Sequence, residues 1–129
     1  MNEKPWKTIL LADDDLFYRE MISLHLESHG FSVVKTHSGS DALKRLLSKG
    51  QYSLAILDIF MGGKTGFEVL EQFKKAVDFC ETDDLPVIAI TSDDSEGTEL
   101  RIRAARANMF LLKPFTKEAL LEAVEQLMR

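Results

Sequence analysis

Two adjacent carboxylates follow a short apolar run near the start of the chain. Asp13 and Asp14 come directly after Ile9–Ala12, and a third carboxylate, Asp58, follows the apolar run Leu54–Leu57. An apolar strand has no use for acidic residues except at its end, where side chains from several strands can meet. Three converging carboxylates repel one another, and a divalent cation removes that conflict. A few hard oxygen ligands favour Mg²⁺, which keeps several waters and leaves room for phosphate oxygens.

Two further apolar runs end in groups that suit phosphate oxygens. Val87–Ile90 is followed by Thr91, and Met109–Leu112 is followed by Lys113. A cation, an ammonium group and a hydroxyl together can stabilise the oxygens of a phosphoryl group in transfer. In that arrangement Asp58 is the nucleophile and forms an aspartyl phosphate. Each residue alone has an ordinary structural explanation, but their joint occurrence at the ends of four strands favours a functional site.

The elements that must position these residues alternate along the chain. The expected strands are Thr8–Ala12, Phe31–Thr36, Ser53–Leu57, a run opened by Pro86, and Met109–Leu112. Helical patterns follow each strand, with Phe17–His29 as the first helix. The expected helix signals are Gly30 and Gly50 as stops, Ser38, Ser95 and Thr116 as N-caps, the Thr65–Glu68 capping box, and an end near Ala105 for the fourth helix. Trp6 is expected to pack against the edge of the first strand.

Five strand–helix units without an internal repeat or a linker predict an α/β fold. The predicted architecture is a doubly wound parallel sheet with helices on both faces, forming one domain over residues 1–129. In such sheets, ligands bind outside the carboxyl ends of the strands. The carboxylates, the hydroxyl and the ammonium group all lie at carboxyl ends, so topology and residue pattern point to the same edge.

Composition limits the remaining possibilities. The 129 residues are 45% apolar and 29% charged, and the net charge of −5 argues against direct nucleic-acid binding. The single cysteine, Cys80, is expected to be a small apolar filler near a helix end, and it favours a reducing cytoplasm. Met1–Pro5 lacks the apolar core of a signal peptide, and no apolar run approaches membrane-spanning length. We therefore expect a cytoplasmic protein without membrane contact.

From about Thr8 onwards the pattern resembles the receiver domain of response regulators in two-component systems. The residues that carry the resemblance are the acidic pair Asp13–Asp14, the phosphoacceptor position Asp58, Met61, Gly66, the hydroxyl position Thr91, the aromatic switch position Phe110, and Lys113–Pro114, a lysine before a cis-linked proline. Two positions depart from the pattern. Gly62 replaces a usual proline and should leave its loop freer, and Arg106 replaces a frequent helix-ending glycine, so that helix end is built differently or strained.

The resemblance implies a flavodoxin-like sheet with strand order 2-1-3-4-5 and a phosphoacceptor function. It implies that Asp13, Asp14, Asp58 and the backbone carbonyl of Phe60 hold Mg²⁺. A sensor histidine kinase or a phosphotransfer protein would phosphorylate Asp58, with Thr91 and Lys113 assisting. The domain would catalyse its own phosphorylation and dephosphorylation rather than act as a conventional enzyme.

The same resemblance implies a switch on the surface of the fourth helix, fifth strand and fifth helix. By this resemblance Thr91 moves towards the phosphoryl group and Phe110 turns into the space that is vacated. The downstream effector is not specified by the sequence, and a homodimer is compatible with it.

Two other readings stay open at this point. A haloacid-dehalogenase-type phosphatase uses an Asp-x-Asp motif after its first strand, which Asp13-x-Asp15 fits, and Asp93–Asp94 imitates its later acidic pair. In that family, however, the lysine precedes the acidic pair, whereas Lys113 comes last here. The other reading is a degenerate receiver that acts only as a binding module, against which the complete set of chemical residues argues.

Overall fold

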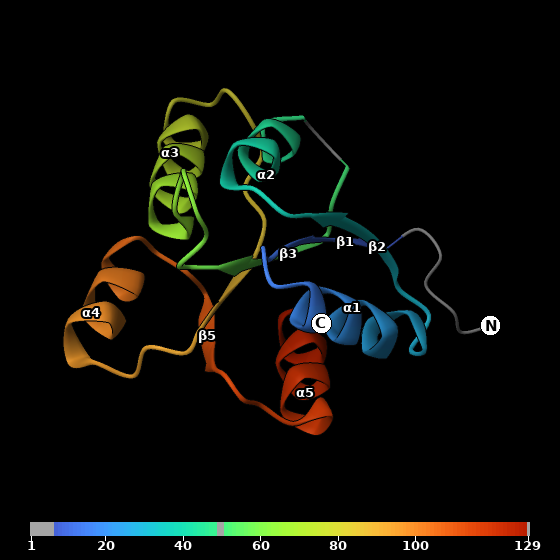
Figure 1. The fold of residues 1–129 in the computed structure, drawn as a ribbon. Helices are drawn as coiled ribbons and strands as arrows, with labels where there is room; N and C mark the ends of the chain where they lie inside the picture. Colours follow the sequence, from blue (N-terminus) through green and yellow to red (C-terminus); the bar gives the residue numbers. More distant parts are fainter. Residues whose placement is uncertain (1–6, 49–50, 129) are drawn as a thin grey trace.

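The computed structural model describes residues 7–48 and 51–128, in which strands and helices alternate (Figure 1). The strands are β1 (Thr8–Ala12), β2 (Ser32–Thr36), β3 (Leu54–Asp58), β4 (Val87–Thr91) and β5 (Met109–Leu112). The helices are α1 (Leu16–Glu27), α2 (Gly39–Leu46), α3 (Gly66–Asp78), α4 (Glu96–Ala104) and α5 (Lys117–Leu127).

All five strands run parallel in one sheet, in the order β2-β1-β3-β4-β5. The predicted doubly wound sheet and the strand order implied by the resemblance are therefore confirmed. Strands β3 and β4 are buried at every residue, which explains why their sequences are apolar runs rather than alternating patterns. In β5, by contrast, every residue is partly exposed, because this strand lies at the edge of the sheet.

Two helical layers cover the sheet. Helices α1 and α5 lie side by side on one face, where Ile9 and Leu11 of β1 join an apolar cluster with Leu26 and Val124 (Figure 1). On the other face, the alternate β1 residue Leu10 packs in a second cluster with residues of α2 and α3. Helix α4 covers that second face beside β5. Because the strands are parallel, their carboxyl ends all lie at one edge of the sheet.

Each helix begins at a side chain that accepts hydrogen bonds from the first turn. The N-caps are Asp15 for α1, Ser38 for α2, Thr65 for α3, Ser95 for α4 and Thr116 for α5. The capping box predicted at Thr65 and Glu68 is present in both directions. The four N-caps predicted from the sequence are therefore confirmed, and Asp15 has the capping role that an isolated strand-end acid often has.

Several predicted boundaries are wrong by a few residues. Helix α1 ends at Glu27 instead of His29, because Gly30 takes a positive φ of 91° and the chain turns there. The N–H of Phe31 donates to the Leu26 carbonyl in this turn, so the strand begins only at Ser32. Helix α2 ends at Leu46. The expected stop at Gly50 and the expected packing of Trp6 lie outside the described residues.

Cys80 and Arg106 occupy left-handed positions at helix ends, with φ of 58° and 70°. In both cases the last turn closes as a glycine would close it: Glu81 N–H donates to Ala76 after α3, and Ala107 N–H to Ile102 after α4. Arg106 thus keeps the usual cap geometry and carries the strain. The expectation for Cys80 as an apolar filler is wrong, because its side chain is exposed.

Candidate functional site

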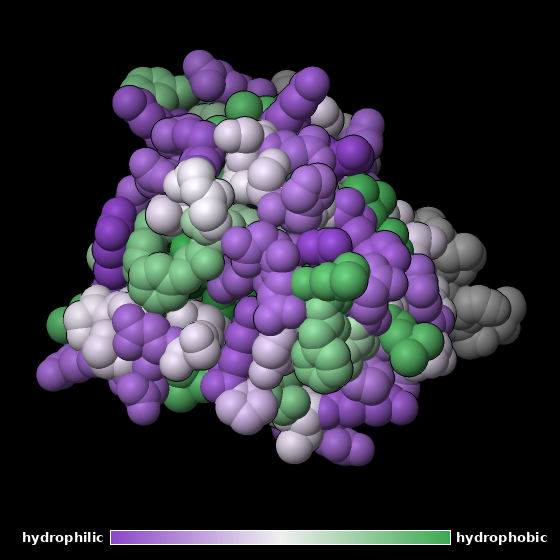
Figure 2. Space-filling view, in the orientation of Figure 1, coloured by the Kyte–Doolittle hydropathy of each residue, from purple (hydrophilic) through white to green (hydrophobic). Residues whose placement is uncertain are grey.

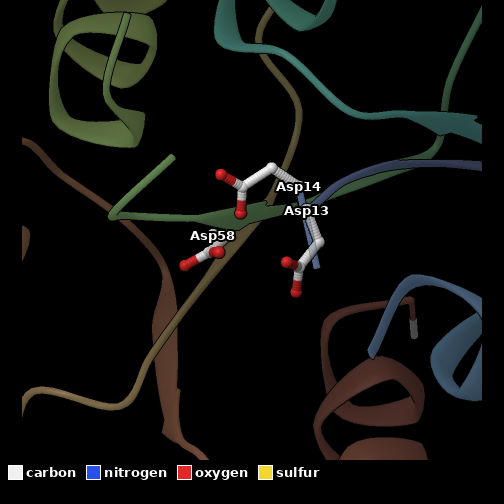
Figure 3. A group of neighbouring side chains, drawn as sticks. All are labelled: Asp13, Asp14 and Asp58. Atoms are coloured by element: carbon white, nitrogen blue, oxygen red, sulfur yellow. The ribbon is translucent and has the colours of Figure 1, made fainter. Parts of the chain in front are cut away.

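The three strand-end carboxylates converge at the open edge of the sheet (Figure 3). Because Ala12 of β1 pairs with Leu57 of β3, the next residues, Asp13 and Asp58, emerge side by side. Asp13 is fully buried and Asp58 is 5% exposed, whereas Asp14 is exposed. One carboxylate oxygen from each of the three lies within 4.8 Å of the others. The predicted acidic cluster is therefore assembled by the fold.

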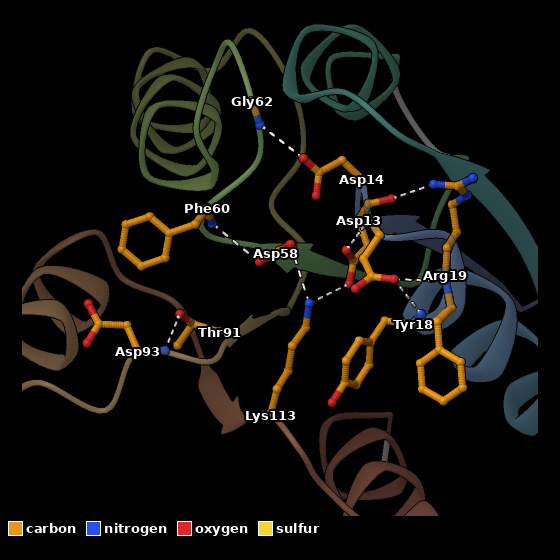
Figure 4. Close-up of polar contacts among 12 residues, drawn as sticks. Asp13, Asp14, Tyr18, Arg19, Asp58, Phe60, Gly62, Thr91, Asp93 and Lys113 are labelled. Carbon is orange, nitrogen blue, oxygen red and sulfur yellow. Dashed lines mark hydrogen bonds and ion pairs between the residues drawn. The ribbon is translucent and has the colours of Figure 1, made fainter.

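Lys113 reaches the same point from the end of β5 (Figure 4). Its Nζ lies 3.0 Å from Asp13 Oδ2 and 3.5 Å from Asp58 Oδ2, and its side chain is 10% exposed. Burial lowers the pKa of the Lys113 ammonium, but the contact with Asp13 and the charges of Asp58 and Asp13 outweigh burial and raise the pKa overall. The lysine therefore stays charged, and its peptide bond to Pro114 is cis, as the resemblance implies.

One ammonium group does not neutralise the carboxylates beside it. Burial, followed by the negative charge of Asp13, raises the pKa of Asp58 to about 6, although Lys113 and the Phe60 N–H act in the opposite direction. Without a metal ion, burial and the charge of Asp13 therefore disfavour the ionised form of Asp58. Additional positive charge beside the carboxylates would favour that ionised form.

The donor atoms of the cluster fit a hard divalent cation. All are oxygens, which is the donor type that Mg²⁺ prefers. Among the described residues, Asp13 Oδ2 accepts no hydrogen bond although it is buried, and its close neighbour is the Lys113 ammonium. Within residues 7–48 and 51–128, the hydrogen bond to Asp58 Oδ1 is a long one of 3.3 Å from the Phe60 N–H. Asp58 Oδ1 could ligate a cation without breaking a strong internal bond, whereas Asp13 Oδ2 would have to share its charge between the cation and the Lys113 ammonium.

Gly62 contributes a backbone group that sequence reasoning missed. Its N–H donates to Asp14 Oδ2 at 3.2 Å, which ties the loop after β3 to the acidic pair after β1. A proline at this position has no N–H and could not make the bond. The expectation that Gly62 only loosens the loop is therefore incomplete, because the substitution also supplies a donor to the site.

Thr91 ends β4 as predicted, and it is fully buried. Its Oγ1 accepts the Asp93 N–H at 3.0 Å. The Asp93 carboxylate, in turn, is bound to the start of α4, accepting from the Ser95 N–H at 2.9 Å and the Thr98 hydroxyl at 2.7 Å. The Thr98 hydroxyl, with Ser95, lowers the pKa of Asp93. Asp93 is thus a fixed anion that stabilises a helix start.

The aromatic positions lie on the α4 side of the carboxylates. Phe60 is 50% exposed, and its ring packs edge-on against Phe67, with ring centres 5.8 Å apart. The Arg101 guanidinium lies 4.1 Å from the centre of the Phe67 ring, so the stack continues to α4. Phe110 is half-buried and packs against a small cluster that includes Phe67 and Ile102. The predicted switch residue therefore contacts α4 through apolar side chains.

Two residues of α1 also reach the site and were not predicted. Arg19 donates to the Asp13 carbonyl at 2.8 Å, and the ring of Tyr18 lies 4.3 Å from Lys113 Nζ (Figure 4). Nothing in the spacing of the sequence indicates that Tyr18 contacts Lys113. On the surface, the site forms a hydrophilic area in the centre of the face, with apolar areas beside it (Figure 2).

This geometry agrees with a comparison to known families. A family model described as the response regulator receiver domain matches residues 9–125. The chain belongs to this family. It is therefore a receiver domain of the kind that two-component signalling systems use, as the sequence pattern predicted. None of the helices in the described part of this receiver domain combines the length and apolar character needed to cross a membrane.

Curated relatives share the receiver domain and extend beyond it. Response regulator MprA of Mycobacterium avium is 35% identical over 121 residues, which covers 94% of this chain and 50% of the relative. The uncharacterized transcriptional regulatory protein YkoG of Bacillus subtilis is 32% identical with the same coverage. The receiver domain described here thus spans about half the length of the curated relatives it matches.

Solved structures confirm the fold of the receiver domain. Chemotaxis protein CheY4 of Vibrio cholerae matches with a TM-score of 0.82 and 26% identity, covering 94% of this chain and 98% of that structure. A DNA-binding response regulator of the LuxR family from Staphylococcus aureus also gives a TM-score of 0.82 and 26% identity, covering 95% and 99%. This chain and these solved structures therefore share the flavodoxin-like architecture.

The family match and the geometry both argue against a haloacid-dehalogenase-type phosphatase. That reading needs Asp15 beside Asp13 as a reacting carboxylate, but Asp15 accepts the N–H groups of Phe17 and Tyr18 as the cap of α1. It also needs Asp93 as an acid near the phosphate, but both oxygens of Asp93 are bound by the first turn of α4. Asp15 is thus the N-cap of α1, and Asp93 is bound at the start of α4, so neither carboxylate is free for that chemistry.

Proposed function

We propose that this chain is a phosphoacceptor of a two-component system, with Asp58 as the residue that accepts the phosphoryl group. The observation that carries the proposal is the convergence of Asp13, Asp14 and Asp58 with the Lys113 ammonium at one point. Residues 1–129 form a single receiver domain in this proposal. The donor is a sensor histidine kinase or a phosphotransfer protein, and the acceptor works in the cytoplasm.

The transfer is a substitution at phosphorus. An oxygen of the Asp58 carboxylate forms the new O–P bond while the N–P bond of the donor phosphohistidine breaks. The bonding electron pair stays on the imidazole nitrogen, which takes up a proton. With acetyl phosphate as donor, an O–P bond breaks instead and acetate leaves. Lys113 lies 3.5 Å from Asp58 Oδ2, so its ammonium can meet the charge on the phosphoryl oxygens, and Thr91 ends the neighbouring strand with a hydroxyl.

Mg²⁺ is the cofactor of this proposal. Asp13, Asp14, Asp58 and the backbone carbonyl of Phe60 would hold it, and when bound it supplies positive charge for the phosphoryl oxygens. The oxygen-only cluster and the weakly bonded Oδ1 of Asp58 support this assignment. The chain catalyses its own phosphorylation and dephosphorylation and does not turn over a separate substrate.

Phosphorylation by a small donor is the direct test. We expect acetyl phosphate with Mg²⁺ to add one phosphoryl group to the wild-type protein, as measured by intact-mass spectrometry. Asp58→Asn should abolish the addition, because no carboxylate oxygen remains at that position, and EDTA should prevent it. Asp83→Asn, at an exposed acid outside the cluster, is the matched control and should behave as wild type.

Two results would contradict the proposal. Modification of Asp58→Asn at the wild-type level would place the phosphoryl group elsewhere. A wild-type protein that stays unmodified by acetyl phosphate and by phosphorylated histidine kinases would favour a degenerate receiver that acts only as a binding module.

The signal is read, in this proposal, on the surface of α4, β5 and α5. Thr91 and Phe110 are the switch residues, and the phosphoryl group must prefer the switched state for the population to shift. The support is local: Phe110 shares an apolar cluster with Ile102 of α4, and the Asp93 N–H that donates to Thr91 belongs to the residue that binds the start of α4.

Chemical shifts test this readout. We expect phosphorylation to change the NMR shifts of Phe110 and Ile102 as well as those near Asp58, because all three lie along the proposed path. The Asp58→Asn protein under the same treatment is the control and should show no such changes. Changes confined to the loop after Asp58 would refute the switch surface.

The aspartyl phosphate should be long-lived. In this proposal the side chains of Phe60 and Asp93 flank the approach of the attacking water, but the Phe60 ring offers no conventional hydrogen bond and both Asp93 oxygens are already bound. We expect Phe60→Asn to speed the decay of the phosphorylated protein about tenfold, which is the effect of one added hydrogen bond to the attacking water. Phe60→Leu, which adds no polar group, should decay at the wild-type rate. An Asn variant that decays no faster would exclude a role for Phe60.

The output partner is proposed only by class. Relatives named as transcriptional or DNA-binding regulators are consistent with an effector that contacts DNA, whereas this unit carries a net charge of −5 and is not expected to bind nucleic acid or membrane itself. A homodimer is compatible with this role.

A further inference from the structure

The Lys113 ammonium has a third neighbour besides its two carboxylates. The centre of the Tyr18 ring lies 4.3 Å from Lys113 Nζ, within the range of a cation–π interaction. Asp13 and Asp58 approach the ammonium from the strand ends, at 3.0 Å and 3.5 Å. Tyr18 approaches from α1, so the ammonium is held between two anions and an aromatic face (Figure 4).

The Tyr18 ring is itself fixed by its surroundings. Its backbone N–H lies in the first turn of α1, which the Asp15 carboxylate caps. Phe17 packs edge-on against the ring at 5.5 Å between centres, and Phe115, from the segment after Lys113, lies at 5.9 Å. Figure 4 shows the Tyr18 hydroxyl pointing away from the carboxylates, so the face of the ring, not the hydroxyl, contacts Lys113.

A ring contact differs from a carboxylate contact in one respect that matters here. Lysine has a flexible four-carbon stem, and its ammonium is held in place only by what surrounds it. When an oxygen of Asp13 or Asp58 ligates a cation or carries a phosphoryl group, it no longer pairs with the Lys113 ammonium as a free carboxylate oxygen does. The ring uses none of these oxygens, so its hold on the ammonium does not compete with either event.

We propose that Tyr18 is a positioning residue, whose ring holds the Lys113 ammonium beside Asp58 so that it meets the incoming phosphoryl oxygens. The proposal rests on the phosphoacceptor function given above and adds a residue to it. The expected contribution of the ring is about 3- to 30-fold in rate, which is the range that cation–π contacts cover from partly exposed to desolvated sites.

A first experiment needs no phosphorylation. A double-mutant cycle of Tyr18→Leu with Lys113→Met, read by urea unfolding in EDTA, isolates the interaction between the two side chains. We expect the interaction between the two side chains to raise the folding equilibrium constant about threefold or more, over what the effects of the two single substitutions predict together. Tyr18→Phe should keep this coupling, because the ring remains. The ring contact would be overturned if no coupling were found, or if Tyr18→Phe, which removes only the hydroxyl, abolished it.

The second experiment measures the rate of acetyl phosphate modification with Mg²⁺. We expect Tyr18→Leu to be slower than wild type by about 3- to 30-fold, and Tyr18→Phe by less than about twofold. In the Lys113→Met background, Tyr18→Leu should add no further slowing, because the ring acts through the ammonium. A purely structural role for Tyr18 would slow both backgrounds equally. Tyr18→Met, which fills similar space, replaces Tyr18→Leu if the latter does not fold.

The outcomes separate this inference from the function on which it rests. If acetyl phosphate modifies wild type and Tyr18→Leu at the same rate, the positioning role is overturned, but the phosphoacceptor function is not. A wild type that is never modified would overturn the function and with it the role of Tyr18, while the unfolding cycle in EDTA would still report whether the ring binds the ammonium.

Discussion

Gly66→Ala should lower the free energy of unfolding by about 3 kcal/mol and disturb the phosphoacceptor strand, because a methyl group has no room there. Gly66 is the first residue of α3, and its N–H donates to the Ile59 carbonyl at 2.9 Å. An added Cβ would clash with the Asp58 carbonyl oxygen and come within 2.7 Å of Ile59 Cα. These are backbone atoms, so either α3 or the end of β3 must move.

Urea unfolding measures the stability, and acetyl phosphate modification reports whether Asp58 keeps its geometry. Gly97→Ala is the matched control, since nothing lies within 4 Å of a Cβ built at this helical position. That control should stabilise the protein slightly, by about 0.5 to 1 kcal/mol, because alanine favours helix over glycine. Equal stability of Gly66→Ala and wild type would show that α3 can shift away from β3 without cost.

Asp58→Asn should stabilise the metal-free protein by about 2 kcal/mol near pH 8. The pKa of Asp58 is raised from 3.8 to about 6 in the folded state, so ionisation of this carboxyl opposes folding. Well below pH 3.8 both states hold the proton and no penalty exists. As the pH rises towards 6 the unfolded state ionises first, and above 6 the full penalty applies. The full shift corresponds to about 3 kcal/mol, part of which local rearrangement recovers.

The measurement is urea unfolding in EDTA at several pH values between 4 and 8. The stability advantage of Asp58→Asn over wild type should grow through this window and level off above pH 6. Added Mg²⁺ should stabilise wild type and remove most of the difference. An advantage that does not change with pH would mean that the charge of Asp58 is not its cause.

Much of the fold followed from local sequence patterns. The N-caps Ser38, Thr65, Ser95 and Thr116 were predictable because a cap is a contact between a side chain and its own first turn. Helix ends were less predictable. Cys80 adopts the left-handed conformation that glycine usually takes, and no local signal indicates it; the same conformation at Arg106 was indicated only by the family resemblance.

The site was predictable to the extent that topology alone determines it. Parallel strands bring their carboxyl ends to one edge, so Asp13, Asp58 and Lys113 were expected at the same edge once the strands were recognised. Contacts that depend on how a helix or loop packs above that edge were not predictable. The Gly62 N–H that binds Asp14 and the Tyr18 ring beside Lys113 depend on distances between elements, which spacing along the chain does not encode.

The attachment of α4 makes the proposed signalling surface sensitive to salt. Thr98 and Ile102 are the residues of this helix that the structure buries. Two ion pairs to α3 add to that small apolar contact: Arg101 with Glu71 at 3.7 Å, and Arg106, just beyond the helix, with Asp78 at 3.1 Å. Both pairs are about half exposed, so dissolved ions screen them. We therefore expect rising ionic strength to weaken the attachment of α4 more than it weakens the sheet, which is held by apolar burial.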